Sequence, residues 1–221
     1  MELFLESLSW LIDPAHWAGP TGILARLGQH VGLTALVIFI AAALALPAGV
    51  AIEHTRRGQN IVAAIAGSVR AIPTLGLLTL LGLLLGIGLA APTIVLVVLA
   101  IPPLLAGAYS GVANVDPMTV RAARALGMSD WQIVRGVELP LAAPIIMGGV
   151  RSAIIQVVAT ATLAAYIADA GLGRFIFSGL ATRRYEEVLG AAIVVILLAL
   201  VLDLGVGYGV KRVERRAKFT A

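Results

Sequence analysis

Long apolar segments fill most of this chain, and polar residues are concentrated in the shorter stretches between them. A helix needs about 20 apolar residues to cross the hydrocarbon core of a membrane. Five segments reach that length, namely residues 31–52, 61–89, 91–109, 145–167 and 188–210. They are too long and too continuous for the strands of an outer-membrane barrel, which alternate over about ten residues. The pattern therefore predicts an all-α polytopic membrane protein with about five transmembrane helices.

Proline residues interrupt three of these segments. Pro73 lies within the second segment, directly after Arg70-Ala71-Ile72, and cannot continue a helix without a kink. We therefore expect the second span to be bent or broken. Pro102 and Pro103 are expected to kink the third span, whereas Pro47 is tolerated near the end of the first.

The polar stretch between the third and fourth spans, residues 116–140, carries the signals of ordered helices. Asp116 can cap a helix that has Pro117 at its first position and that runs to about Leu126. Gly127 then suits the left-handed conformation in which many helices end. The pattern predicts one short helix followed by a sharp turn.

A second short helix is predicted directly after this turn. Ser129 and Gln132 have the spacing of a capping box, and Leu139-Pro140 is expected to end the helix because the residue before proline avoids helical geometry. The predicted cytoplasmic helix–turn–helix exposes three apolar side chains, those of Met128, Trp131 and Ile133. An amphipathic hairpin resting on lipid is an alternative. A DNA-reading motif is disfavoured, because the exposed residues are apolar rather than basic.

The composition agrees with a membrane protein. Of the 221 residues, 60% are hydrophobic and only 13% are charged, and the mean hydropathy is +0.99. A soluble domain of this size needs more polar surface. The net charge of +4 does not indicate nucleic-acid binding, because the basic residues sit at the ends of apolar segments and not on one polar face. The absence of cysteine excludes disulfides and thiolate metal sites.

Basic residues also predict the orientation in the membrane. If residues 1–30 lie outside, the inner segments carry 11 of the 16 Lys and Arg residues and the outer segments carry only four. We therefore expect the N-terminus outside and the C-terminus inside. The expected organisation is an extracytoplasmic or interfacial segment (1–30), a five-helix transmembrane domain (31–210) with a long inner loop (116–144), and a basic cytoplasmic tail (211–221).

Catalytic machinery is not predicted. The three histidines, His16, His30 and His54, fall on both predicted sides of the membrane, so neither a catalytic triad nor a two-histidine metal site is expected. The chain has no Gly-x-x-x-x-Gly-Lys-Ser/Thr phosphate loop, and its first lysine is Lys211. If ATP drives this protein, a separate subunit must hydrolyse it.

Several positions of the inner loop resemble the EAA loop of ABC-importer permeases. Ala122-Ala123 is followed after three residues by Gly127 and, after nine more, by Val137-Glu138-Leu139-Pro140. The family pattern has Glu-Ala-Ala, Gly and Ile-x-Leu-Pro at the same spacing, and this chain departs from it at Arg121, which replaces the usual Glu. The likeness extends from about residue 32 to residue 210, the five-span core of small permeases of the methionine-importer type.

The resemblance implies a coupling helix that seats in a groove of a nucleotide-binding subunit. The residues expected to form this coupling loop are Ala122, Ala123, Gly127, Met128, Ser129, Trp131, Gln132, Leu139 and Pro140. The implied partners are an ATP-binding-cassette subunit holding ATP and Mg, a second permease copy or paralogue, an extracytoplasmic solute-binding protein and the lipid bilayer. No cofactor is expected on this chain, and the implied location is the cytoplasmic (plasma) membrane of a bacterium.

Four further stretches are similar to permeases for osmoprotectants such as glycine betaine, choline, carnitine or proline. They are residues 70–76, 99–109, 138–144 and 168–173. Permeases for amino acids such as methionine share several of these motifs, so an amino-acid permease is one alternative, and an ATP-independent channel is another. The spans contain no cluster of three aromatic residues that could cage a quaternary ammonium. We therefore expect the solute-binding protein to carry that cage.

Polar and turn-forming positions supply candidates for a translocation path or gate. These candidates are Arg70, Pro73, Gln156, Gly171, Gly173 and Phe175. A charge such as Arg70 within a span is a functional candidate by default, whereas Gln156 can instead bond across helices. Arg151 is expected to snorkel to the inner interface, and Asp203 to pair with a basic residue or to face a helix backbone.

Overall fold

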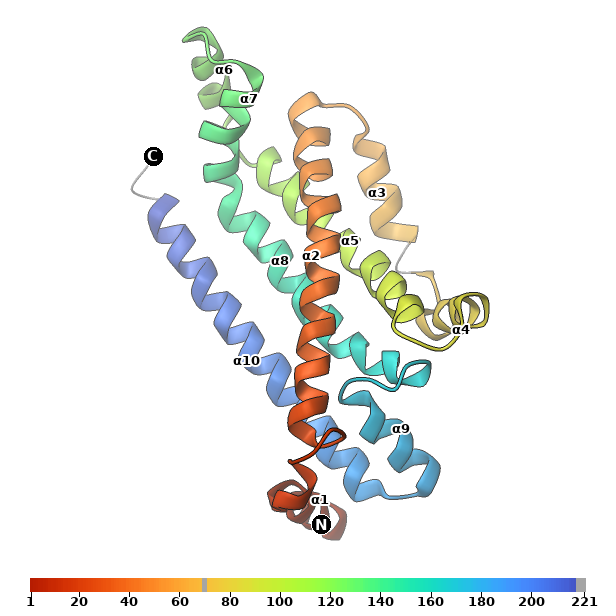
Figure 1. The fold of residues 1–221 in the computed structure, drawn as a ribbon. Coiled ribbons are helices and arrows are strands. Elements are labelled where there is room, and N and C mark those ends of the chain that lie inside the picture. Colours follow the sequence, from red (N-terminus) through yellow and green to blue (C-terminus); the bar gives the residue numbers. More distant parts are fainter. Residues whose placement is uncertain (69–70, 218–221) are drawn as a thin grey trace. The chain divides into compact units, whose positions relative to one another are not determined.

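The computed structural model describes residues 1–68 and 71–217, and every regular element in these ranges is helical (Figure 1). The elements that precede the inner loop are α1 (Glu2–Ile12), η1 (Pro14–His16), α2 (Ile23–Thr55), α3 (Gln59–Ser68), α4 (Thr74–Leu85) and α5 (Ala90–Ala113). Those that follow are α6 (Pro117–Ala125), α7 (Asp130–Ile133), the π-helical η3 (Val134–Glu138), α8 (Leu139–Thr160), the 3₁₀-helical η4 (Ala161–Tyr166), α9 (Gly173–Thr182) and α10 (Tyr185–Ala217).

Four described helices are long and apolar enough to cross a membrane. They cover Ile23–Thr55, Ala90–Ala113, Asp130–Tyr166 and Tyr185–Arg212, and they correspond to the first, third, fourth and fifth predicted spans. The first begins eight residues earlier than expected, so the predicted N-terminal segment 1–30 already contains the start of α2. The last continues to Ala217, into the predicted tail.

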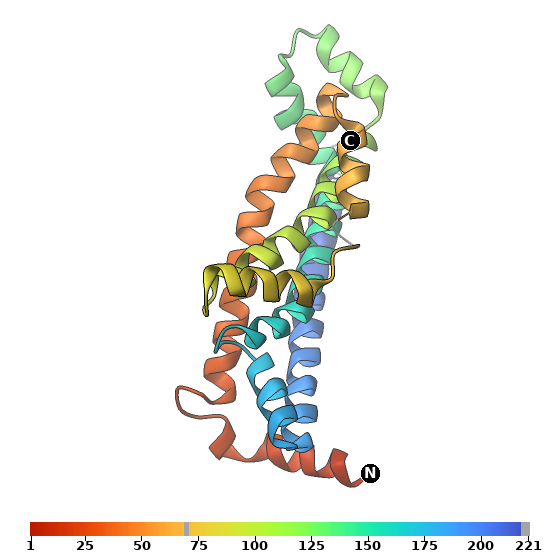
Figure 2. The ribbon, with the colours of Figure 1, turned by 90° about the vertical axis from the view of Figure 1, so that its right-hand side faces the viewer.

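The second predicted span is broken, as its proline indicated. Its described residues form two short helices, α3 at Gln59–Ser68 and α4 at Thr74–Leu85, and Pro73 stands at the N-terminal cap of α4. At 1.5 Å per residue, the 12 residues of α4 extend only about 18 Å, less than the roughly 30 Å of a bilayer core. Figure 2 shows α4 side-on. The residues that the structure describes therefore include four long apolar helices and one shorter apolar helix, close to the predicted five spans.

The helices group into two compact units, and several of them continue from one unit into the other. The first unit comprises Met1–Phe39, Ile72–Leu99 and Ile154–Leu202. Its core contains Trp10, Ile23, Leu172 and Val195. The buried side chain of Arg26 donates to the carbonyl of Asp169 over 2.6 Å and to its carboxylate over 2.8 Å, which fixes the loop before α9 against α2.

The second unit comprises Ile40–Ala71, Ala100–Ala153 and Asp203–Ala221. Its core contains Val50, Ala108, Val112, Val115 and Ala142. Nearby, α5 and α8 approach closely at glycines. A Cβ placed on Gly107 would lie 2.7 Å from the Cα of Gly149, and one on Gly149 would lie 2.8 Å from the Cα of Gly107. Such close backbone contact between membrane helices is typical of small residues. This packing holds the ends of α5 and α8 from which the inner loop projects.

Candidate functional site

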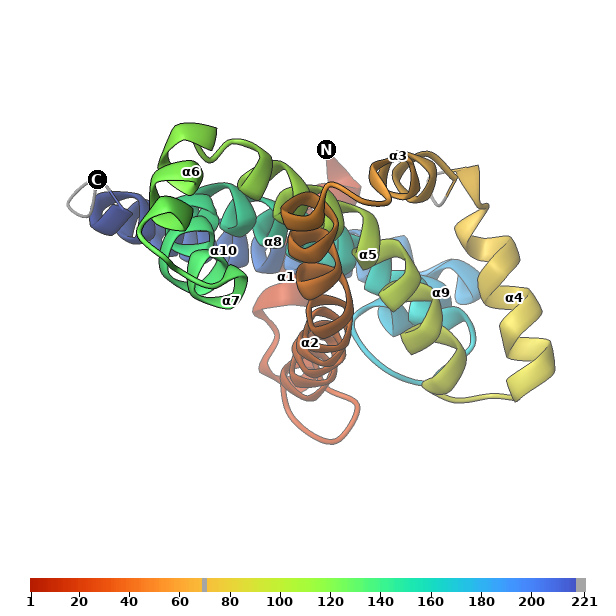
Figure 3. The ribbon, with the colours of Figure 1, turned by 90° about the horizontal axis from the view of Figure 1, so that it is seen from above.

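The loop between α5 and α8 forms an ordered hairpin of two helices, α6 and α7, which Figure 3 shows from above. The carboxylate of Asp116 accepts a 2.9 Å hydrogen bond from the N–H of Met118 and caps α6. At the other end, the N–H of Gly127 donates to Arg124 and the N–H of Met128 donates to Ala123. These two bonds, with Gly127 at φ +84°, make a Schellman motif. The predicted first helix and its glycine turn are confirmed.

The capping box that opens the second helix is also confirmed. The side chain of Gln132 accepts a 2.8 Å hydrogen bond from the N–H of Ser129, and the Ser129 hydroxyl accepts one from the N–H of Gln132 at 3.4 Å. Both residues are exposed, so this reciprocal pair orders the start of α7 through local bonds alone. The start of α7 is therefore set by its own sequence.

The prediction that Leu139-Pro140 ends the second helix is wrong. Helix α7 runs through η3 into α8, and the helical segment extends without interruption from Asp130 to Tyr166. Proline lacks an N–H, and its ring clashes with the carbonyl four residues earlier in a regular α-helix. Here the turn before Pro140 is widened to a π-helix, in which the N–H of Leu139 bonds to the carbonyl of Val134. The wider turn admits the proline, so the hairpin is directly continuous with a spanning helix.

The three apolar residues predicted to be exposed on the hairpin differ in burial. Trp131 is 68% exposed, as predicted, and Met128 is half-buried. Ile133 was also expected to be exposed, but it is fully buried, because α7 continues as a packed helix instead of ending as a free surface turn. Of the coupling-loop alanines, Ala122 is exposed and Ala123 is buried.

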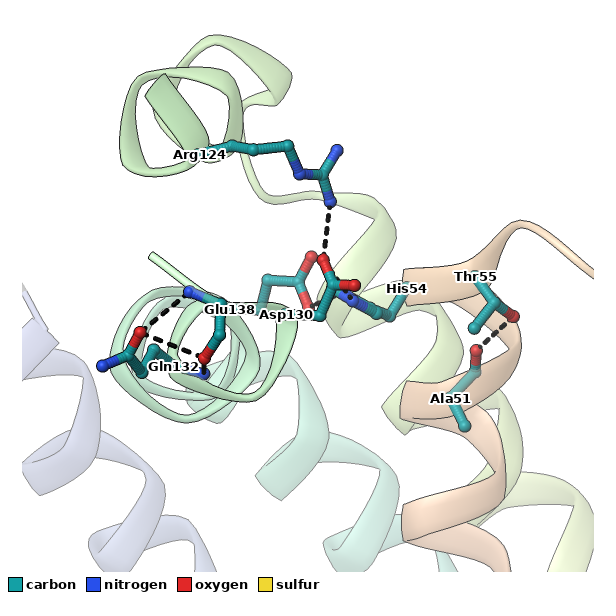
Figure 4. Close-up of polar contacts among 8 residues, drawn as sticks. Ala51, His54, Thr55, Arg124, Asp130, Gln132 and Glu138 are labelled. Atoms are coloured by element: carbon teal, nitrogen blue, oxygen red, sulfur yellow. Dashed lines mark hydrogen bonds and ion pairs between the residues drawn. The ribbon is translucent and has the colours of Figure 1, made fainter. Parts of the chain in front are cut away.

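Charged side chains connect the hairpin to the end of α2 (Figure 4). His54 Nδ1 lies 2.7 Å from Glu138 Oε2, and His54 Nε2 lies 3.7 Å from Asp130 Oδ1. Arg124 Nη2 reaches the same Asp130 oxygen at 3.1 Å. Glu138 is only 4% exposed, so its carboxylate depends on His54 for a charged or hydrogen-bonding partner. The cluster joins α6, α7 and η3 to α2.

Sequence reasoning missed this cluster. His54 and Glu138 are 84 residues apart, and no short motif relates them. The available signal was an acidic residue, Glu138, within an otherwise apolar stretch, because a buried acid requires a partner. Arg121, which replaces the family's Glu, is exposed and donates to the carbonyl of Pro117 at 3.3 Å and to Met118 Sδ at 3.1 Å. Its described hydrogen bonds therefore stay within α6.

An apolar cavity of about 490 Å³ lies beside the hairpin. It is lined by residues of α2 and of the continuous helix that begins with α7, namely Leu46, Pro47, Val50, Ala51, His54, Thr55, Trp131, Val134, Leu139 and Ile146. The exposed ring of Trp131 therefore lies at the edge of this apolar cavity. Among the residues that the structure describes, no group of three or more His, Asp or Glu side chains could hold a metal ion.

The candidate path residues have separate local environments. Gln156 donates to the carbonyl of Leu99 at 3.1 Å, the bond across helices that was its alternative role. Gly171, at φ +74°, donates its N–H to Gln29 at 3.0 Å. A Cβ on Gly173 would collide with the carbonyl of Thr162, so only glycine fits there.

The other two described path candidates also have local roles. Phe175 packs edge-on against Trp10, with ring centroids 5.5 Å apart, in the core of the first unit. Pro73 caps α4, and Arg70 lies outside the described residues. Whether any of these residues lines a path stays a prediction.

Arg151 forms a two-fold contact with Asp203 of α10 (Nε–Oδ1 2.5 Å, Nη2–Oδ2 2.6 Å). Its expected reach to the inner interface stays a prediction. Asp203 therefore pairs with a basic residue, the first of the two roles expected for it.

Known proteins of similar sequence and fold bear on this architecture. Residues 38–219 match the family described as the inner membrane component of binding-protein-dependent transport systems. The carnitine transport permease protein OpuCB of Listeria monocytogenes is 34% identical over 185 residues, which cover 84% of this chain and 85% of the relative. The glycine betaine/carnitine/choline permease protein OpuCB of Bacillus subtilis is 33% identical, with coverage of 82% and 83%.

The fold is also similar to that of a solved transporter. A chain of the MetNI methionine ABC transporter, in an inward-facing conformation, superposes with a TM-score of 0.75 at 23% identity, over 93% of this chain and 97% of that one. The resemblance to ABC-importer permeases is thereby confirmed. This chain belongs to the family of inner membrane components of binding-protein-dependent transport systems.

Proposed function

We propose that this chain is the transmembrane permease subunit of an ATP-driven importer for a small osmoprotectant such as glycine betaine, choline, carnitine or proline. The observation that carries the substrate class is the match, over more than four-fifths of both chains, to permeases named for carnitine, glycine betaine and choline transport. The likeness to the methionine transporter, at 23% identity, supports the fold alone.

The hairpin α6–α7 is proposed to dock on the ATP-binding subunit. Trp131 supports this role, because an exposed aromatic ring beside apolar surface is a common anchor in protein interfaces. The helix that carries Trp131 continues into a membrane span, so a displacement of the docked hairpin can be transmitted along one continuous helical segment. The proposed partner subunit holds ATP and Mg, since this chain contains no phosphate loop.

The remaining partners and the orientation complete the proposal. A second permease copy or a paralogue forms the other half of the pore, and an extracytoplasmic solute-binding protein delivers the solute. The excess of basic residues in the hairpin, in the loop after α2 and in the C-terminal segment supports an inner location for all three, with the N-terminus outside. The membrane is proposed to be the bacterial cytoplasmic membrane.

Reconstitution tests this function. The permease is placed in proteoliposomes with its ATPase subunit and solute-binding protein, and uptake of labelled glycine betaine is measured with and without ATP. Trp131→Ala is expected to abolish most ATP-driven uptake and to weaken retention of the ATPase, because the anchor is lost while the fold is kept. Phe39→Ala is the matched control, since Phe39 is also an exposed aromatic residue but lies within α2, 15 residues before His54.

Each contrary result has a definite meaning. Uptake that needs no ATP contradicts the importer and favours a channel. ATP-driven uptake of methionine but not of glycine betaine contradicts the substrate class. Normal uptake and normal ATPase binding by the Trp131→Ala variant contradict the docking role of the hairpin.

A further inference from the structure

A charged pair lies within two spanning helices of the second unit. Arg151 of α8 and Asp203 of α10 meet through two parallel N–H···O contacts of 2.5 and 2.6 Å. This fork geometry is characteristic of strong arginine–carboxylate pairs. Arg151 belongs to the spanning helix Asp130–Tyr166, and Asp203 belongs to the spanning helix Tyr185–Arg212.

Both charges fall within the apolar segments predicted to span the membrane. At 1.5 Å per residue, Arg151 lies roughly 9 Å along the axis from residue 145, where the predicted fourth span begins. Asp203 lies roughly 10 Å from residue 210, where the predicted fifth span ends. Charged residues at such positions normally face a protein interior or water and not lipid, because exposure of a charge to hydrocarbon is costly.

The pair is nevertheless not buried within the chain. The Arg151 side chain is 43% exposed and the Asp203 side chain is 24% exposed. A guanidinium has five N–H groups, and the two bonds to Asp203 use two of them. No other acceptor for Arg151 occurs among the hydrogen bonds of the described residues. The exposed side of the pair is therefore rich in hydrogen-bond donors that require water or an anionic group.

The backbone of α10 passes close to this guanidinium. Gly207 lies one turn after Asp203, and a Cβ on it would be only 3.4 Å from Arg151 Cζ. Glycine at this position lets the guanidinium pack closely against the α10 backbone, and a side chain introduced there would stand directly beside the pair. A pair that served only to join α8 and α10 would not need the free donors of Arg151.

We propose that the Arg151–Asp203 pair lines the water-accessible solute path and that Arg151 receives the carboxylate of a zwitterionic solute there. This inference rests on the proposed function as an osmoprotectant importer. A solute with a carboxylate and a quaternary ammonium presents one charge to each member of the pair. Choline, which has the ammonium but no carboxylate, would gain nothing from the donors of Arg151.

Cysteine labelling tests the water access directly, because the chain has no native cysteine. In the assembled complex, Gly207→Cys is expected to react with a membrane-impermeant charged thiol reagent and to be slowed by excess glycine betaine. Gly205→Cys is the matched control, because it lies only about 3 Å away along α10 but about 200° around it, and a Cβ there meets open space. It is expected to stay unreactive. Equal reaction rates at the two positions would overturn the proposal.

A second variant keeps the test decisive if Gly207→Cys fails to fold. Ser152→Cys lies on the exposed surface of α8, next to Arg151, and is expected to react like Gly207→Cys. If both variants assemble and neither reacts faster than Gly205→Cys, the pair does not face water and the proposal fails. The mass of the labelled chain gives the readout, so cysteines of other subunits do not interfere.

Uptake by Arg151→Lys tests the carboxylate. Lysine keeps the positive charge but lacks the planar guanidinium that can donate two parallel hydrogen bonds to a carboxylate. Glycine betaine uptake is therefore expected to fall about tenfold or more, while choline uptake changes little. Equal losses for both solutes would contradict carboxylate recognition. If the wild-type complex takes up neither solute, the proposed function fails instead, and the labelling experiment still decides whether the pair faces water.

Discussion

At the scale of single residues, the hairpin depends on contacts between side chains that are distant in sequence. The imidazole of His54 and the carboxylate of Glu138 are 2.7 Å apart, and both side chains are largely buried. Asp130 and Arg124 extend the same cluster to the exposed end of the hairpin. A carboxylate in such a place is stable only while it keeps its partner. The cluster thus makes the position of the hairpin sensitive to one residue of α2.

His54→Ala is expected to destabilise the permease by about 3 kcal/mol, because it leaves the Glu138 carboxylate buried without a partner. Denaturant or thermal unfolding of the purified protein in detergent measures the change. In the double variant His54→Ala/Glu138→Gln the stranded charge is gone, so part of the lost stability is expected to return. Strict additivity of the two single changes would show that the pair contributes no coupling energy.

At the scale of elements, features that depend on neighbouring residues could be predicted from the sequence, whereas features that depend on long-range contacts could not. The Asp116 cap, the turn at Gly127 and the Ser129–Gln132 box could be predicted, because each is completed by bonds between residues at most five positions apart. The break at Pro73 could be predicted for the same reason. These features define the two ends of α6 and the start of α7.

Features that depend on distant parts of the chain could not be predicted. No local pattern pairs His54 with Glu138 or Arg151 with Asp203, because each pair forms only when two helices pack. The continuation of α7 through Pro140 was missed because the rule that helices end before proline assumes a regular α-turn. The π-turn at η3 removes that conflict, and the same error placed Ile133 on the surface.

Pro140→Ala is expected to weaken binding of the ATPase subunit although Pro140 lies outside the exposed tip. Alanine supplies an N–H and fits a regular α-helix, so the wide turn is no longer required. If the π-turn becomes a regular α-turn, its hydrogen bond spans one residue fewer. Helix α7 then rotates by about 100° relative to α8, and Trp131 turns away from its present direction. Co-purification of the ATPase with the permease gives the measurement.

Pro144→Ala is the control for this change. Pro144 lies in the same helix but within α8, beyond the π-turn, so its replacement is expected to leave ATPase binding unchanged. ATPase binding by the Pro140→Ala variant that equals that of the wild type would contradict a role for η3 in aiming the hairpin.

At the scale of the whole molecule, the proposed coupling to an ATPase requires one orientation in the membrane. The hairpin must face the cytoplasm, where ATP is available. The distribution of basic residues predicts this orientation independently of the family. The two lines of reasoning use different residues, since the charge argument also draws on the loop after α2 and on the C-terminal segment. An orientation measurement therefore tests both of them.

Thiol labelling of intact cells provides that measurement in the cysteine-free chain. Ala18→Cys, exposed in the segment before α2, is expected to react with an impermeant maleimide from outside. Ala125→Cys, exposed at the end of α6, is expected to react only after the cells are permeabilised. The two alanines serve as controls for each other, because both are small and accessible. The reverse pattern would place the hairpin outside, out of reach of any cytoplasmic ATPase, and would contradict the proposed coupling role together with the predicted topology.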